Sequence, residues 1–368
     1  MDRLIVKNFG PLKDVDIELN KINLFIGENG SGKSVLGKII TIVLDFNTSE
    51  DILKKFTEYN IGFILEDTVI EYHSDDKIYL KLQDKKIIFD NEIQKVRTYA
   101  KDVIQRINEV KDYTASNKQE VKALEDFRIE LKGFQEKYQK LKSQYIPAER
   151  NLISLFNKSL TTLLVAEVPL PKFLLAFSSE FEKAGNEIQE LEFLNVKYVN
   201  GDGADRHKVY FNDEYYLDLE QSSSGIQSAL PLYLTVKYFA QKHSTIIIEE
   251  PEQNLFPKAQ KETVEYIVEQ ISDENSLFMM THSPYILTAL NNLILANDVK
   301  EQKGLEAIEG IVKEEQCVAF KQVSAYMLVD GKSINIMDKE DRLIGVNLID
   351  AISDEVSSTF DALLAKLD

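Results

Sequence analysis

Cysteine is nearly absent from this chain of 368 residues. The one cysteine, Cys317, excludes a disulfide within the chain and a zinc site built from several cysteines. It lies in an apolar stretch, and we interpret it as a small core residue.

Long hydrophobic runs are also missing. The sequence has no apolar stretch of about 18 residues, the length that a membrane-spanning helix needs. Its first residues, Met1-Asp2-Arg3-Leu4, lack the charged and apolar blocks of a signal peptide. Because 44% of the residues are hydrophobic, the chain can still form a substantial core. We therefore expect a globular, cytoplasmic protein with no membrane partner.

Positive charge is scarce, with 43 Lys and Arg residues against 61 Asp and Glu residues. The net charge of -18 argues against a broad nucleic-acid-binding surface, because phosphate contacts need clustered basic side chains. Residues 91–145 are the exception: they carry 12 basic and 9 acidic residues, which leaves 31 minus 52, or -21, for the rest. This segment either contacts a polyanion such as DNA or forms a solvated helical surface, and we favour the second interpretation.

The hydrophobic pattern predicts an α/β fold without internal repeats. Alternation at residues 4–19 predicts a β-hairpin, and an apolar run at 22–26 leads into a glycine-rich loop that a helical pattern follows. Residues 62–90 alternate again, as in an antiparallel β meander. Strands and helices then alternate around Ile246-Ile247-Ile248, which indicates a parallel sheet buried on both faces.

Helical spacing in the middle of the chain predicts an insertion. Apolar residues recur every three or four positions through residues 96–110 and 121–145, as in two short antiparallel helices of a coiled-coil hairpin. Further helices are expected at 151–165 and 171–191, strand-like stretches at Glu192–Val199, Lys208–Phe211 and Tyr215–Leu219, a hairpin at 325–337 and a terminal helix from Leu348. The predicted domains are 1–90 (N-terminal lobe), 91–145 (helical insertion), 146–300 (C-terminal lobe) and 301–368 (hairpin and helix).

The glycine-rich loop matches the phosphate-loop pattern G-x-x-x-x-G-K-[ST] in full. Its residues are Gly27, Glu28, Asn29, Gly30, Ser31, Gly32, Lys33 and Ser34. In this pattern the backbone N–H groups surround the phosphates, the lysine contacts the β and γ phosphates, and the hydroxyl of the last residue binds magnesium. The sequence therefore predicts a site for ATP with Mg²⁺.

Two adjacent acids, Glu249 and Glu250, end the apolar strand at 246–248. A buried strand does not end in two carboxylates without partners for their charge. In a phosphate-loop enzyme the first acid faces the magnesium and the second takes a proton from the attacking water. We predict that Glu249 is a metal-side residue and that Glu250 is the general base.

Two further segments fall where they could contact the nucleotide. His282 follows the next apolar strand, at the same carboxyl edge of the sheet, where it could bind the γ-phosphate or the attacking water. Ser222-Ser223-Ser224-Gly225 precedes a helix, so its hydroxyl and N–H groups can form an anion-binding cap.

In this order, the four segments resemble ABC-class ATPases of the SMC, RecF and OLD-like branch. The resemblance covers roughly residues 1–45 and 145–300. It implies an ABC-type nucleotide-binding domain with a mixed sheet, an antiparallel β subdomain and a helical insertion. It also implies that Ser223 of one subunit, with Ser224 and Gly225, contacts the γ-phosphate bound by the other subunit of a head-to-tail homodimer.

The same resemblance implies that Glu250 is the catalytic glutamate, that His282 is the switch histidine and that residues 252–257 form the dimer-contacting D-loop. Three departures stand out: Glu249 replaces an aspartate, Ser224 replaces a glycine, and no Q-loop glutamine is evident.

The segment Tyr145-Ile146-Pro147-Ala148-Glu149-Arg150 is similar to one in small AAA-family ATPases of antiphage systems such as Septu, PARIS and retron operons. Arg150 could reach a phosphate or the partner subunit, or it could form a structural salt bridge.

Three functions follow. The first is a regulatory ATPase of an antiviral defence or toxin-like module that controls a separately encoded effector. The second is a DNA-associated repair or maintenance ATPase, and the third, which fits less well, is a transporter subunit. Only 72 residues follow Ala296 (368 minus 296), so we expect no Toprim nuclease domain.

Overall fold

The computed structural model describes residues 2–45, 52–74, 77–91, 93–95, 98, 143–156, 165–201, 206–242, 244–345 and 357–366. The predicted helical insertion at 91–145 therefore lies almost entirely outside the described residues. Of the predicted terminal helix, residues 357–364 are helical and residues 348–356 lie outside.

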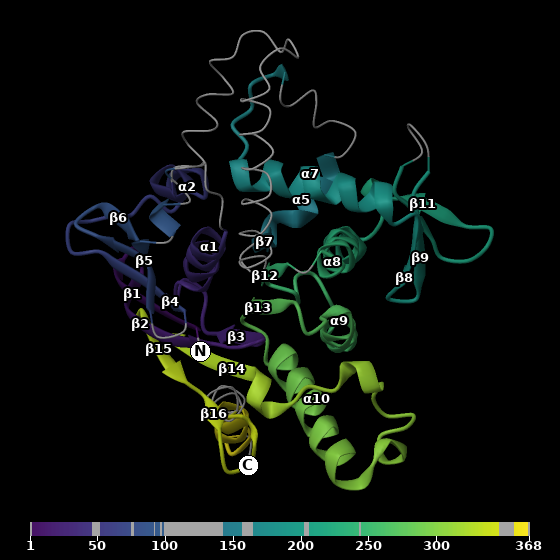
Figure 1. Cartoon of the computed structure of the whole chain (residues 1–368). Coiled ribbons are helices and arrows are strands. Elements are labelled where there is room, and N and C mark those ends of the chain that lie inside the picture. Colours follow the sequence, from purple (N-terminus) through teal and green to yellow (C-terminus); the bar gives the residue numbers. More distant parts are fainter. Residues whose placement is uncertain are drawn as a thin grey trace, which may run out of the picture.

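Within the described ranges, eleven strands form one mixed sheet (Figure 1). In spatial order they are β6 (Lys86–Phe89), β5 (Lys77–Gln83), β4 (Val69–Ser74), β1 (Asp2–Phe9), β2 (Leu12–Leu19), β15 (Lys332–Asn335), β14 (Val323–Val329), β3 (Ile22–Ile26), β13 (Ser276–Thr281), β12 (Thr245–Glu249) and β7 (Ser143–Ile146). The five strands from β14 to β7 are parallel, whereas β1, β2, β4, β5 and β6 pair antiparallel. The predicted mixed α/β fold is confirmed.

The parallel strands are covered on both faces. Every residue of β3 and of β12 is buried, which explains why these runs are continuously apolar rather than alternating. The helix α1 (Lys33–Leu44) packs on one face of the parallel strands, and α8 (Ser224–Ala240), α9 (Pro257–Gln270) and α10 (Pro284–Lys303) lie on the other (Figure 1). The predicted parallel pairing and burial on both faces around Ile246-Ile247-Ile248 are confirmed, and this strand lies next to the edge strand β7.

The remaining helices are short or peripheral. The α-helices are α2 (Ile52–Glu58), α5 (Asn151–Phe156) and α7 (Lys172–Glu187). The 3₁₀ helices are η2 (Ala148–Arg150), η5 (Leu219–Gln221), η6 (Leu305–Ala307), η7 (Glu314–Gln316) and η8 (Phe320–Gln322). Among the described residues, no helix combines the length and apolarity needed to cross a membrane.

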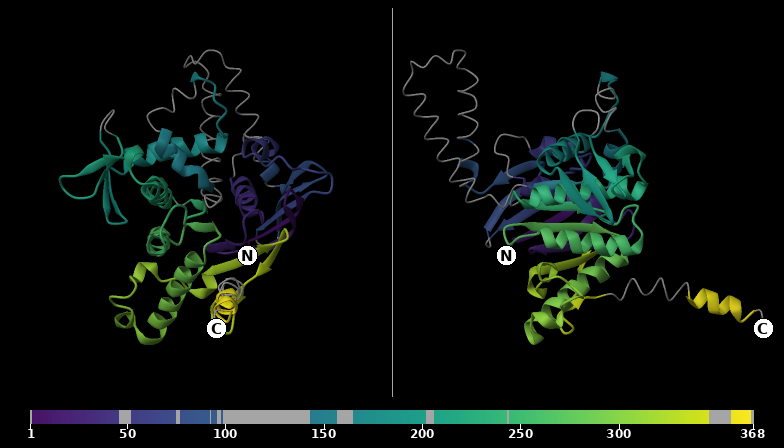
Figure 2. Two further views of the ribbon diagram at one scale, coloured as in Figure 1. Left: turned by 180° about the vertical axis from the view of Figure 1, so that it is seen from behind. Right: turned by 90° about the vertical axis from the view of Figure 1, so that its right-hand side faces the viewer.

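A second, antiparallel sheet lies at the opposite end of the molecule from β4–β6 (Figures 1 and 2). It contains β8 (Glu190–Phe193), β9 (Val196–Val199), β10 (Lys208–Tyr210) and β11 (Tyr216–Asp218). The strand-like stretches predicted at Lys208–Phe211 and Tyr215–Leu219 are confirmed as β10 and β11. The stretch predicted at Glu192–Val199 is partly wrong, because Leu194 and Asn195 adopt φ values of 46° and 60° and reverse the chain between β8 and β9. The helix predicted to reach Leu191 ends at Glu187 for the same reason: β8 begins at Glu190.

Both ends of the chain contribute to the main sheet. The predicted C-terminal hairpin is present as β14 and β15, and β14 pairs with β3, the strand that precedes the phosphate loop. A small two-stranded sheet of β16 (Met337–Asp338) and β17 (Leu343–Ile344) follows. The N-terminal and C-terminal segments therefore build one core.

One predicted helix is partly wrong. Residues 143–145, assigned to the second insertion helix, belong to strand β7, which pairs in parallel with β12. The apolar pair Tyr145 and Ile146 is compatible with both helical and strand periodicity. Pairing with β12 makes this segment a strand.

Candidate functional site

The phosphate loop spans residues 27–32, between β3 and α1. The strand, loop and helix context predicted for this motif is therefore present. Gly32 has a φ of 101°, and a Cβ at this position would lie 2.5 Å from Leu12 Cδ2. At Gly27 a Cβ would lie 2.6 Å from the Leu328 carbonyl oxygen of β14. These two positions accept only glycine without rearrangement, because the loop is pressed against β2 and β14.

Lys33 begins α1 and turns back over the loop. Its Nζ donates hydrogen bonds to the carbonyl oxygens of Gly27 (2.8 Å) and Glu28 (2.9 Å). Burial lowers the pKa of Lys33, and the negative charges of Glu250, Glu252 and Glu249 act in the opposite direction. A buried ammonium thus faces the acids of the neighbouring strand ends.

Two serines of the loop differ in exposure. Ser34, in the first turn of α1, is exposed, so its hydroxyl is open to a ligand. Within the part of the chain that the structure describes, the buried Ser31 Oγ has no hydrogen-bond partner.

The chain turns sharply after β12, and this turn separates the two acids. Glu249 is 3% exposed, whereas Glu250 adopts a φ of 45° and its side chain is 33% exposed. Such a φ is costly for a residue other than glycine. The Glu250 N–H compensates by donating to the Met280 carbonyl of β13 at 2.8 Å. One carboxylate therefore stays inside the fold while its neighbour points outward.

Glu249 is held in a low-polarity environment. Burial raises its pKa, and the buried phenol of Tyr145 lies beside it. Burial also raises the pKa of Tyr145, and the charge of Glu249 raises it further. Among the described residues, Glu249 Oε1 has no hydrogen-bond partner, which is the condition expected of an acid whose ligand comes from outside the chain.

His282 follows β13 and lies beside two carboxylates. Its Nδ1 is 3.8 Å from Glu250 Oε1 and 3.3 Å from Glu252 Oε1. The structure therefore brings the predicted base and the predicted histidine together. Sequence reasoning missed Glu252 as a partner of His282 and gave it only as part of a dimer-contacting segment.

Ser223 is the N-cap of α8, and its hydroxyl accepts a long hydrogen bond of 3.5 Å from the Ile226 N–H. Ser223 and Ser224 are both exposed. The start of α8 is joined to the segment after Glu250, since Asn254 Nδ2 donates to Ser228 Oγ at 2.8 Å. The second turn of α8 is thus joined to the segment that follows the acids, while Ser223 at the helix start stays exposed.

Arg150 lies inside the protein, in contrast to the prediction that it reaches a phosphate or a partner subunit. It is fully buried (0% exposed). Its guanidinium donates to four carbonyl oxygens, those of Pro147, Ser228, Glu249 and Glu250, at 2.7–3.1 Å. Burial lowers its pKa to about 10, although the nearby glutamates oppose this change. Arg150 does not form the predicted salt bridge either, because the acceptors of its hydrogen bonds are backbone carbonyl oxygens.

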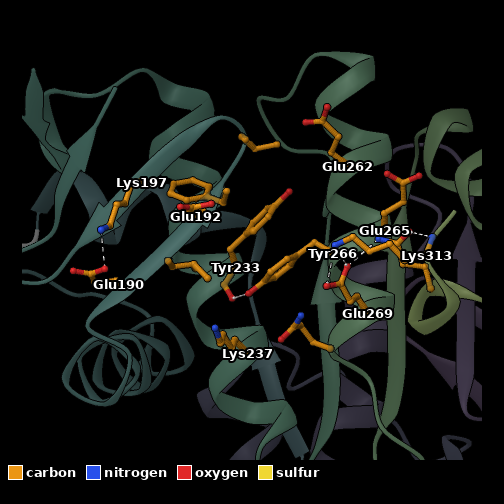
Figure 3. A pocket seen from close by; sticks show the side chains of 15 residues that line it. Glu190, Glu192, Lys197, Tyr233, Lys237, Glu262, Glu265, Tyr266, Glu269 and Lys313 are labelled. Atoms are coloured by element: carbon orange, nitrogen blue, oxygen red, sulfur yellow. Dashed lines mark hydrogen bonds and ion pairs between the residues drawn. The ribbon is translucent and has the colours of Figure 1, made fainter. Parts of the chain in front are cut away.

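A separate cavity of about 600 Å³ lies between α8, α9 and the β8–β9 hairpin (Figure 3). Tyr233 and Tyr266 stack along its wall, with ring centroids 4.2 Å apart. Some of the charged side chains around it pair with one another, such as Glu269 with Lys313 at 3.0 Å. None of the nucleotide-site residues named above lines this cavity, and we assign no ligand to it.

Comparisons with known proteins identify the family of this chain. The family model described as AAA ATPase domain matches residues 1–152 and 68–287. The chain is 23% identical to the DNA repair protein RecN of Rickettsia felis, over 90% of this chain and 67% of RecN. It is 22% identical to the OLD nuclease of Thermus scotoductus, over 90% of this chain and 68% of the nuclease.

Among solved structures, the SMC head domain from Thermotoga maritima is similar, with a TM-score of 0.40 and 10% identity, over 91% of this chain and 97% of that domain. The family match spans most of the chain and includes the phosphate loop, Glu249, Glu250 and His282. The protein belongs to the AAA ATPase domain family and is an ATPase, similar in sequence to RecN and to the OLD nuclease.

Proposed function

We propose that two copies of this ATPase enclose ATP between them, each supplying a phosphate loop to one nucleotide and Ser223 to the other. The observation that carries this proposal is the split character of the site. Lys33, Glu249, Glu250 and His282 gather around one loop, whereas Ser223 stands exposed at a different helix end. A helix N-terminus with exposed hydroxyl and N–H groups is suited to an anion, and a second copy would bring one.

Within each site, the side chains divide the chemistry. Lys33 contacts the β and γ phosphates as a point charge, replacing its two carbonyl contacts by phosphate oxygens. Glu250, half-exposed and directed outward, accepts a proton from the water that attacks the γ-phosphate. His282 hydrogen-bonds to the γ-phosphate or to that water.

Magnesium fits the residues present. Ser34 offers an exposed hydroxyl and Glu249 a buried carboxylate with an unpartnered oxygen, and hard oxygen ligands of this kind suit Mg²⁺. Within the described residues, no three His, Cys, Asp or Glu side chains converge on a metal position, so most ligands would be phosphate oxygens and water. When bound, the ion would neutralise charge on the phosphates.

Mixing two inactive variants tests the shared site. Lys33→Met removes the charge of the phosphate loop, and Ser223→Ala removes the hydroxyl that contacts the nucleotide of the other copy without adding bulk to the interface. Each variant alone should hydrolyse ATP slowly. A mixed dimer restores one intact site, so an equal mixture should recover up to about a quarter of the wild-type rate. A mixture no faster than the sum of its parts would contradict the shared site.

The biological role that we propose is regulation of a separately encoded effector in an antiphage or toxin-like module. Dimer closure on ATP would hold or release that effector. The support is the similarity of residues 145–150, and of the pattern E-E-P-E-x-x-L-x-P from Glu249 to Pro257, to small OLD-like ATPases.

The alternative role is DNA repair or maintenance. Two relatives are named DNA repair protein RecN, from Rickettsia felis and Rickettsia typhi, which favours this alternative over a transporter subunit. The segment at 91–145, with its charge of +3, is where DNA contact is expected.

ATP hydrolysis with and without duplex DNA separates the two roles. Stimulation that falls steeply as salt rises would support the DNA-associated role, because phosphate contacts release counterions. No response to DNA, together with co-purification of the product of an adjacent gene, would support control of an effector.

A further inference from the structure

We propose that Glu252 is a positioning residue that fixes the orientation and tautomer of His282. The inference rests on the proposed role of His282 in ATP hydrolysis and names the residue that prepares it for that role. No motif of the sequence pointed to this function.

One carboxylate oxygen makes the relevant contacts. Glu252 Oε1 accepts hydrogen bonds from the Thr281 hydroxyl at 2.7 Å and from the His282 backbone N–H at 2.8 Å. The ring nitrogen Nδ1 of His282 lies 3.3 Å from the same oxygen. Glu252 thus hydrogen-bonds to the end of β13 and to the backbone of the histidine, and the same oxygen lies within ion-pair distance of the ring.

The two side chains of this contact differ in burial. Glu252 is 4% exposed, whereas the His282 side chain is 43% exposed. The carboxylate cannot turn to water, but the ring can, so the fixed member of the pair is Glu252. Among the described residues, Glu252 Oε2 is buried without a hydrogen-bond partner, so part of the carboxylate charge is not compensated by donors and favours a proton on the neighbouring ring nitrogen.

The contact decides which ring nitrogen is available. A proton on Nδ1 is stabilised by the Glu252 carboxylate, which leaves Nε2 as the nitrogen that faces the nucleotide. Glu250 Oε1 lies at 3.8 Å, beyond hydrogen-bond distance. Because Glu252 holds the ring, Glu250 remains free to act on water.

Nuclear magnetic resonance of the ¹⁵N-histidine-labelled full chain tests the tautomer directly. At about pH 8.5, where imidazole is neutral, His282 should carry its proton on Nδ1 in the wild type and shift toward the Nε2 form in Glu252→Gln. The signal that disappears in His282→Gln identifies the residue. A wild-type His282 protonated on Nε2, or the same tautomer in both proteins, would overturn the proposal.

Steady-state ATP hydrolysis supplies a second readout. Glu252→Gln should lower kcat about tenfold and change the KM for ATP less than about threefold, because a charge-assisted contact becomes neutral. In the His282→Ala background the same substitution should lower kcat less than about twofold, since Glu252 acts through the ring. An equal tenfold loss in both backgrounds would show that Glu252 acts elsewhere.

Thr281→Val is the matched control. It removes a donor from the same Glu252 oxygen but leaves the carboxylate and the ring in place, so kcat should fall less than about threefold and the tautomer should not change. If Thr281→Val reproduces both effects of Glu252→Gln, the role of Glu252 is structural only. If His282→Ala alone leaves kcat unchanged, the proposed role of His282 fails, while the tautomer measurement still decides the role of Glu252.

Discussion

At the scale of single residues, the Lys33 ammonium donates hydrogen bonds to two carbonyl oxygens of its own loop. Phosphate oxygens can replace both acceptors, and they carry charge, so we expect the lysine to favour bound nucleotide. Lys33→Met should weaken ATP binding at least about tenfold in a calorimetric titration. Lys54→Met is the control, because Lys54 is 70% exposed on α2. Equal ATP affinity of Lys33→Met and the wild type would contradict this account.

Glu249 is the residue on which the magnesium assignment depends. Its carboxylate is buried and, among the described residues, its Oε1 has no hydrogen-bond partner. Chelation of divalent ions should abolish hydrolysis, and added Mg²⁺ should restore it. In Glu249→Gln, the Mg²⁺ concentration for half-maximal hydrolysis should rise about tenfold, because the neutral amide attracts the hydrated ion less. An unchanged Mg²⁺ dependence would exclude Glu249 from the metal side of the site.

At the scale of elements, Arg150 connects the strand β12 and the helix α8, which both position residues of the site. It binds the carbonyls that end β12 and the Ser228 carbonyl in the first turns of α8. Arg150→Met would remove the four hydrogen bonds that the guanidinium donates to buried carbonyls, at a cost to the free energy of unfolding of about 3 kcal/mol. Arg206→Met, which removes an exposed ion pair with Glu182, should cost less than about 1 kcal/mol. Chemical denaturation measures both, and similar losses would argue against the buried link.

The sequence was sufficient to predict the elements whose pattern is local. The phosphate loop, the parallel strand at 246–248 and the N-terminal hairpin are each determined by spacing and turn residues close in the chain. The β7 strand and the burial of Arg150 depend on partners about 100 positions away, such as Glu250, and single-sequence periodicity carries no such information. The positive φ of Glu250 likewise results from contacts with β13 and Arg150.

At the scale of the whole molecule, the sheet joins both ends of the chain, because β14 lies against β3 and its Leu328 carbonyl abuts Gly27. The phosphate loop is therefore supported by the last strands as much as by the first. The serine cap of α8 remains exposed, so the account predicts a site that a single copy leaves incomplete.

Light scattering of the Glu250→Gln variant tests this central claim most directly. Without the general base, ATP should bind and persist, so the mass should rise from 42.1 kDa to twice that value only when ATP and Mg²⁺ are both present. ADP should leave the protein monomeric, and adding Ser223→Arg to Glu250→Gln should abolish the increase. A Glu250→Gln variant that hydrolyses ATP at the wild-type rate, or that stays at 42.1 kDa with ATP and Mg²⁺, would contradict the account.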